Sequence, residues 1–123
     1  MAVTYTPAVK NARLTAVVTA IGATGVLEIG TAGMASVLAT IALNSTAGTA
    51  SGGVLTFSGF PKSDTSADNS GTAAAARIRT ASGGTDIVTG LTVGTSGSDI
   101  NLDSVSITAG QTVTINSATI THA

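Results

Sequence analysis

The sequence lacks cysteine and tryptophan, and its only aromatic side chains are Tyr5, Phe57 and Phe60. Without cysteine the chain forms no disulfide and offers no thiolate to a metal ion. With so few aromatic rings, the hydrophobic core has to be built from aliphatic side chains. The same shortage argues against a sugar-binding groove, because such grooves use more aromatic and polar groups than this chain offers.

Charge is also scarce. Charged residues make up 9% of the chain, against roughly 25% in ordinary soluble domains. The net charge is −1, so nucleic acid, which is bound mainly through Lys and Arg, is not an expected partner. The one histidine, His122, lies next to the last residue, whereas a catalytic histidine needs an orienting partner in a pocket. We therefore predict a protein that is not an enzyme and holds no cofactor and no metal.

With cysteine and histidine excluded, the acidic residues are the remaining candidates for a metal or catalytic site. The spacing of Asp64, Ser66 and Asp68 resembles the start of a calcium loop, but Asn69 and Ala75 stand where an EF-hand needs Gly and Glu. Asx turns explain this stretch better. The six acids are Glu28, Asp64, Asp68, Asp86, Asp99 and Asp103.

Long hydrophobic runs are missing as well. The mean hydropathy is +0.47, yet the longest uncharged stretch, residues 29–61, is interrupted by glycine, serine and threonine. A membrane-spanning helix needs about 20 consecutive apolar residues. The sequence therefore predicts no membrane partner.

What the chain has in abundance is small residues: Ala, Gly, Ser and Thr supply 71 of the 123 positions. Near the N-terminus they are ordered as a helix. Thr6 followed by Pro7 is typical of a helix start, the apolar residues of 14–21 recur on one helical face, and Gly22 is a usual helix stop. We predict an α-helix over residues 7–21.

After Gly25 the apolar residues alternate with Thr and Ser, as in strands with one buried face. Turn dipeptides such as Gly52-Gly53, Gly83-Gly84 and Asn116-Ser117 separate the runs. The pattern predicts a mainly β fold: a jelly-roll-like antiparallel β-sandwich of about eight strands, with an immunoglobulin-like sandwich as the alternative. Residues 1–6 are expected to form an extended arm and residues 7–123 a single domain, with the polar segment 62–71 as its most mobile loop.

Two groups of residues are candidate partner contacts. Val3 and Tyr5 alternate with threonines in the N-terminal arm, where Tyr5 either closes the end of the sandwich or anchors a neighbour. Arg77 and Arg79 flank Ile78 and so share the outward face of one strand. They either form a solvated face that blocks aggregation or bind carboxylates of a partner.

Several segments give the chain a wider resemblance: VKNARLTAVVTAIG, GVLEIGTAG, LATIALN, SDTSADNSGTA and ITAGQTVTI. With them, the chain resembles small virion proteins of tailed bacteriophages, in particular capsid decoration or cement proteins. The resemblance spans nearly the whole chain and rests on patterns of small residues. It implies a jelly-roll-like sandwich that binds outside an icosahedral shell, and it carries no catalytic residues.

These observations lead to one expected function. We expect a non-enzymatic virion protein on the outer capsid surface, which binds the major capsid protein and other copies of itself and stabilises the lattice. Unpaired strand edges would give a homodimer. A position in the phage neck or tail and a cell-surface adhesion module remain the alternatives.

Overall fold

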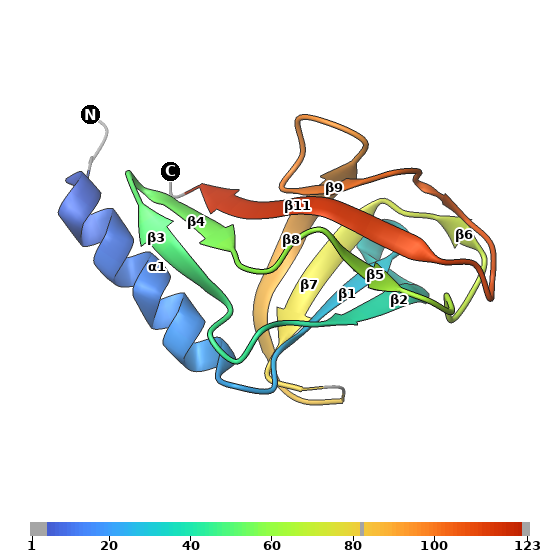
Figure 1. Cartoon of the computed structure of the whole chain (residues 1–123), viewed down its shortest axis with the longest axis horizontal. Coiled ribbons are helices and arrows are strands. Elements are labelled where there is room, and N and C mark those ends of the chain that lie inside the picture. The colour runs from blue at the N-terminus through green and yellow to red at the C-terminus, as the bar shows by residue number, and fades with distance from the viewer. Residues whose placement is uncertain (1–4, 82, 122–123) are drawn as a thin grey trace.

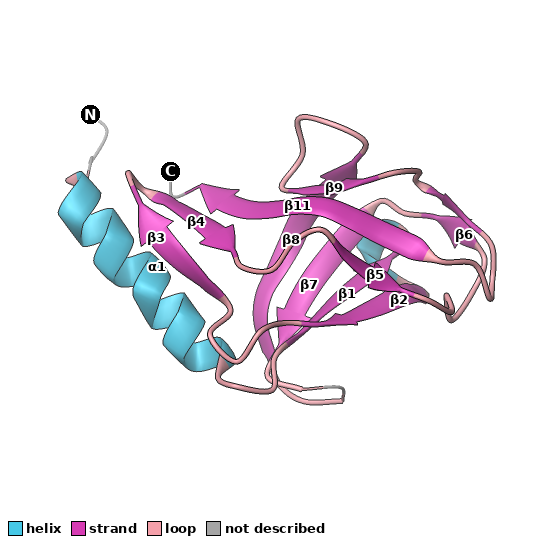
Figure 2. Cartoon of the chain, viewed as in Figure 1, coloured by secondary structure: helices cyan, strands magenta, loops and turns pink. Residues whose placement is uncertain are grey.

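The computed structural model describes residues 5–81 and 83–121. Val3 and His122 lie outside these ranges. The chain forms one long helix at one side of a curled β-sheet (Figure 1). Figure 2 shows how strands make up most of the remainder. The predicted mainly β class with an N-terminal helix is therefore confirmed.

Helix α1 (Pro7–Ile21) has the predicted bounds. Thr6 is extended (φ −66°, ψ 156°), Pro7 takes the first helical position, and Gly22, at φ +75°, ends the helix with its N–H bonded to the carbonyl of Val18. The helix buries Leu14 and Ile21 and lies against β3 and β4. The helix therefore contacts the sheet through a narrow stripe of side chains, and most of its surface is exposed to solvent.

The strands are short, as the closely spaced turn residues predict. They are β1 (Val26–Gly30), β2 (Val37–Ala42), β3 (Gly48–Ser51), β4 (Val54–Phe57), β5 (Lys62–Asp64), β6 (Gly71–Thr72), β7 (Ala75–Arg79), β8 (Asp86–Gly94), β9 (Ile100–Leu102), β10 (Ser106–Ile107) and β11 (Val113–Thr121). A short 3₁₀ helix, η1 (Ala32–Met34), follows β1.

Nine of these strands belong to one sheet, in the order β2-β1-β7-β8-β9-β11-β4-β3, with β5 also paired to β11. The remaining two, β10 and β6, pair with each other. The sheet is mixed, because β8 and β9 run parallel. The prediction of an antiparallel fold is thus correct for the other strand pairs, but the architecture is one curled mixed sheet.

The long strand β11 holds the curl together by pairing with three strands in turn. Its first residues pair with β5, its middle with β9 and its last with β4. The predicted turn at Asn116-Ser117 is wrong: β11 continues through it with a register shift between Ile115 and Ser117. A bulge of this kind adds one residue and reverses the alternation, which gives the same sequence pattern as a turn between two strands.

The sheet closes where β5 comes to lie against β2. The amide of Thr40 donates to Asp64 Oδ2 at 3.0 Å, and the amide of Asp68 donates to the carbonyl of Leu38 at 2.7 Å. Asp64 also accepts from the amide of Ser66, which confirms the predicted Asx turn. Segment 62–71 therefore forms the seam of the curled sheet, and its mobility stays a prediction.

The core fills the inside of the curl with aliphatic side chains. The largest fully buried ones are Ile21, Leu27, Ile29, Leu38, Leu55, Ile78, Ile100, Leu102 and Ile115. Strand β7 alternates as predicted, with Ala76 and Ile78 buried and its two arginines on the opposite face. No helix among the described residues combines the length and hydropathy needed to span a membrane.

Candidate functional site

The most distinctive group of side chains is a charged cluster on the outer face of β1, β7 and β8. Glu28 lies on β1, directly opposite Arg77 of β7, and Arg79 lies opposite Asp86 of β8. The Nε of Arg77 donates to Glu28 Oε1 at 2.6 Å. The three ion pairs found among the described residues all belong to this cluster.

Glu28 is the buried member of the cluster. It is 6% exposed, whereas Asp86 has a side chain 43% exposed. Every residue of β1 is buried. On the outer face the two arginines lie against Glu28 and the Met34 side chain lies against Gly30, while the core covers the inner face. A buried carboxylate is tolerated only with charge-paired, hydrogen-bonded partners, and Arg77 provides them.

Arg79 is fixed by three contacts. Its Nη2 donates to the carbonyl of Gly84 at 2.6 Å, its Nη1 lies 3.8 Å from Glu28 Oε1, and its Nε lies 2.9 Å from Asp86 Oδ1. The Nε–H is not aimed at that oxygen, so the last contact is an ion pair without a hydrogen bond. Arg79 therefore ties the turn between β7 and β8 to the sheet.

The side chain of Arg77 makes fewer polar contacts than that of Arg79. The Nε bond to Glu28 is the one hydrogen bond that its side chain makes to the residues the structure describes. The side chain is 23% exposed. Its two terminal amino groups thus retain donors for another molecule. The sequence placed Arg77 and Arg79 on one outward face, and the structure does so too. Of the two, Arg77 is the one with both terminal amino groups without a hydrogen-bond partner among the described residues.

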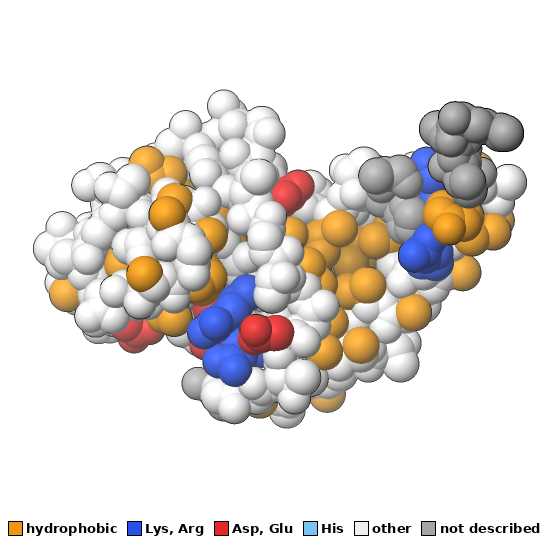
Figure 3. Space-filling model, turned by 180° about the vertical axis from the view of Figure 1, so that it is seen from behind, with side chains coloured by type: hydrophobic (Ala, Val, Ile, Leu, Met, Phe, Trp, Pro, Cys, Tyr) orange, Lys and Arg blue, Asp and Glu red, His pale blue; other side chains and the backbone are white. Residues whose placement is uncertain are grey.

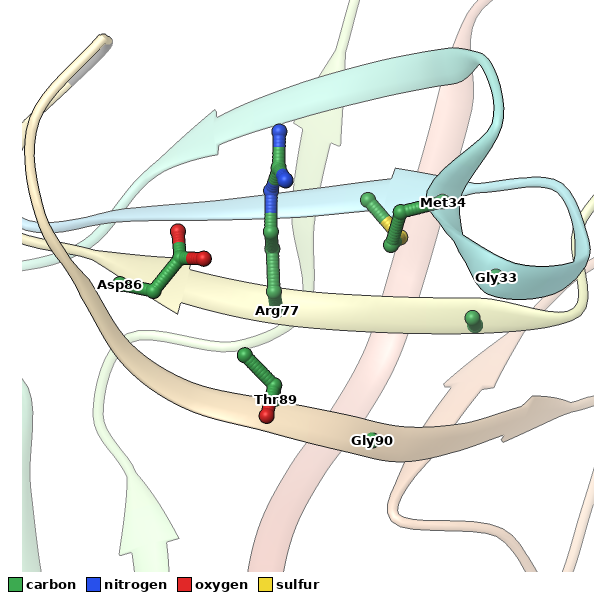
Figure 4. Close-up of a pocket in the computed structure, with 7 residues that line it drawn as sticks. Gly33, Met34, Arg77, Asp86, Thr89 and Gly90 are labelled. Atoms are coloured by element: carbon green, nitrogen blue, oxygen red, sulfur yellow. The ribbon is translucent and has the colours of Figure 1, made fainter.

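Beside Arg77 lies an open pocket of about 400 Å³. Figure 4 shows Arg77 crossing from β7 over β1, Met34 approaching from the turn after β1, and Asp86 and Thr89 rising from β8. The full lining is Gly33, Met34, Ala75, Arg77, Asp86, Thr89 and Gly90.

Two backbone features shape this pocket. Strand β8 has a register shift opposite Arg77, and Gly90 there has φ +75°. This β-bulge turns the exposed Thr89 toward the pocket (Figure 4). On the other side, a Cβ on Gly30 would come within 2.9 Å of the Met34 side chain, so the glycine lets Met34 lie over β1.

The rear face of the molecule carries more than this pocket. Figure 3 shows one group of basic side chains with an acidic neighbour, a second basic group at the helix end, and hydrophobic side chains lining the hollow between them. The ion-paired arginines form the first group. At the helix end, Arg13 stacks over the ring of Tyr5 with its Cζ 4.7 Å from the ring centroid.

Tyr5 is 42% exposed and Val9, one helical turn later, is 43% exposed. Tyr5 therefore leaves a large part of its ring accessible on the surface. Of the two residues predicted as contacts in the N-terminal arm, Tyr5 is placed near the helix start, and Val3 is outside the described residues.

Three of the other acids make hydrogen bonds within the fold. Asp64 accepts from two backbone amides, Asp68 accepts from the hydroxyl of Thr40, and Asp99 accepts from the amide and hydroxyl of Thr92. Within residues 5–81 and 83–121, no three side chains of His, Cys, Asp or Glu gather as a metal site would require.

Sequence reasoning found Arg77 and Arg79 but missed Glu28, Met34 and the bulge at Thr89. The signal for Glu28 was present, because it is the one acid within an apolar alternating run. In comparisons with known proteins, no protein-family model, no curated protein and no solved structure matches the chain.

Proposed function

We propose that this chain is a non-enzymatic structural protein of a tailed-phage virion, which binds the outside of the capsid lattice and stabilises it. The observation that carries the proposal is the rear face, where the arginine cluster and the Tyr5 end of the helix flank a hydrophobic hollow (Figure 3). Such a face suits docking on another protein, because specific interfaces combine an apolar centre with polar and charged groups around it.

Low charge supports the same proposal. Among the described residues the ion pairs form a single cluster, and Thr and Ser cover much of the remaining strand surface. Few ionic groups then have to lose water when the face is covered. Burial of about 800 Å² per partner gives a specific contact, and repetition over one lattice adds avidity.

The resemblance to decoration proteins also implies a fold, the jelly-roll-like sandwich. We include in the proposal that the curled sheet is a variant of a jelly-roll-like sandwich, with β9 and β11 joining its two halves. The major capsid protein is the proposed partner, together with other copies of this chain. Since the ends of the sheet, β2 and β3, lie against β5 and α1, we place a homodimer contact on a face of the sheet.

The test is direct addition of the purified chain to undecorated tailed-phage capsids. We expect a regular outer layer in electron micrographs and a higher temperature of capsid disruption. Irregular or absent binding would contradict the proposal. Binding to purified tails, or to host cells without any affinity for capsids, would instead support the neck or tail position or the adhesion module.

A further inference from the structure

Arg77 carries an inference about what the rear face recognises. We propose that the pocket beside Arg77 receives the carboxylate of an Asp or Glu side chain from the protein on which this chain docks. The inference rests on the proposed function only for the statement that the partner is a protein surface; the recognition chemistry is separate from the capsid.

The first step is the state of the guanidinium. Its Nε is held by Glu28 Oε1 at 2.6 Å, and Glu28 is itself fixed in a buried strand. The planar end of the side chain is therefore oriented before any partner arrives. Pre-orientation reduces the conformational entropy lost on binding. The two terminal amino groups match the two oxygens of a carboxylate, which arginine binds in a bidentate way.

The second step concerns the neighbouring charges. Arg77 and Arg79 are balanced by Glu28 and Asp86, so the cluster has no excess charge. Arg79 Nε lies 2.9 Å from Asp86 Oδ1 and compensates the charge of that carboxylate. Asp86 therefore does not occupy the free donors of Arg77. An incoming carboxylate would thus be held by directional N–H donors at short range. For a single side chain the affinity should be weak, with a Kd on the order of millimolar.

The third step is the apolar part of the pocket. Met34 and Ala75 line it, and Gly33 and Gly90 contribute no side chain. A Cβ built on either glycine would meet no atom within 4 Å, so open space lies in front of both. The methylene groups of a glutamate can therefore pack on Met34 while its carboxylate reaches Arg77. Thr89, on the bulge, adds a hydroxyl at the rim (Figure 4).

The alternative occupant of the pocket is a basic side chain of the partner, which would pair with Asp86. Asp86 is already the ion-pair partner of Arg79, and its carboxylate is 43% exposed to water. Exposed ion pairs contribute little to binding. The structure therefore favours an acidic side chain over a basic one, and the experiment separates the two.

The experiment is a titration of the full chain, followed by NMR at the Arg77 Nε–H and the Met34 methyl group. The probes are N-acetylglutamate N-methylamide and its glutamine and lysine counterparts. We expect saturable shifts at both positions with the glutamate probe and binding at least tenfold weaker with the glutamine probe. Equal binding of the glutamine probe, preference for the lysine probe or absence of saturation would overturn the proposal.

Two variants make the test specific to the pocket. Arg77→Lys keeps a cation beside Glu28 but removes the two terminal amino groups that bind both carboxylate oxygens. The affinity for the glutamate probe should therefore fall at least fivefold. Thr89→Trp fills the pocket from the exposed bulge and leaves all four charged residues in place, so the saturable shift should vanish. Thr95→Trp puts the same side chain on an exposed turn outside the pocket and should preserve it.

These readouts are independent of capsid binding. A chain that binds the glutamate probe but no capsid would contradict the proposed function and support the pocket. A chain that decorates capsids equally well with and without Thr89→Trp, and ignores the probe, would contradict the pocket alone.

Discussion

Glu28 and Arg77 face each other directly across β1 and β7, with Arg77 Nε 2.6 Å from Glu28 Oε1. The carboxylate is buried at a strand position where an alternating sequence would normally place a polar residue in water. The arginine therefore has two tasks. It compensates the buried charge of Glu28, and its terminal amino groups keep donors for another molecule.

The first prediction follows from this pair. Glu28→Ala should lower the free energy of unfolding by about 3 kcal/mol, because Arg77 then loses the ion-pair partner that it has among the described residues, in a largely buried site. Glu28→Gln should cost less, since its amide oxygen can still accept from Nε. Urea unfolding measures both, and the midpoint should fall without a change of slope.

The double variant Glu28→Ala/Arg77→Ala completes a cycle. It removes both charges, so its stability loss should be smaller than the sum of the two single losses, with an interaction free energy of roughly 0.5–3 kcal/mol. Strict additivity of the two losses would mean that the pair contributes nothing to folding.

The second prediction concerns the seam between β2 and β5. Asp64→Ala should destabilise the fold by about 1–3 kcal/mol, because the amides of Thr40 and Ser66 lose their acceptor. Hydrogen exchange at the Thr40 amide should become faster. Asp68→Ala is the matched control, since the Asp68 side chain accepts from the Thr40 hydroxyl and from no backbone amide of the described residues, while its own amide keeps the bond to Leu38. Equal protection of Thr40 in both variants would show that the seam does not depend on Asp64.

The third prediction tests whether the helix belongs to the folded domain. Leu14 is 3% exposed, and Leu14→Ala should cost about 3 kcal/mol in the free energy of unfolding. Val9→Ala changes an exposed residue of the same helix and should stay within about 0.5 kcal/mol. If thermal unfolding showed the same stability for both variants, α1 would be an appendage rather than part of the core.

Local signals explain what the sequence predicted well. Pro7 and Gly22 act on the few residues next to them, so the helix bounds could be read directly, although the side chain of Thr6 makes no capping hydrogen bond. The alternation around Ile78 likewise depends only on neighbours, and it placed Arg77 and Arg79 on one face. Neither signal says which strand lies alongside.

Long-range pairing explains what the sequence could not show. Glu28 meets Arg77 only because β7 lies beside β1, although 49 positions separate the two residues. The parallel pairing of β8 with β9 joins near neighbours in sequence, Val93 with Ile100, but alternation does not indicate the direction in which two strands pair. Strands β5, β6 and β10 are two or three residues long, too short to carry an alternation of their own. The lining of the pocket comes from three separate segments, residues 33–34, 75–77 and 86–90, so no pattern within one segment predicts it.

The last prediction concerns Tyr5 and the arm that was expected to reach a neighbour. Removal of residues 1–6 should weaken attachment to capsids more than it weakens folding. Tyr5 is 42% exposed and stacks with Arg13, whereas Leu14 and Ile21 are the residues that the helix buries, and the deletion leaves both in place. Tyr5→Ala alone should reproduce most of the effect, because an aromatic ring contributes strongly at interface centres. Capsid pelleting would measure attachment and urea unfolding would measure folding in parallel. If attachment and stability fell together, the segment would be part of the core and not a contact.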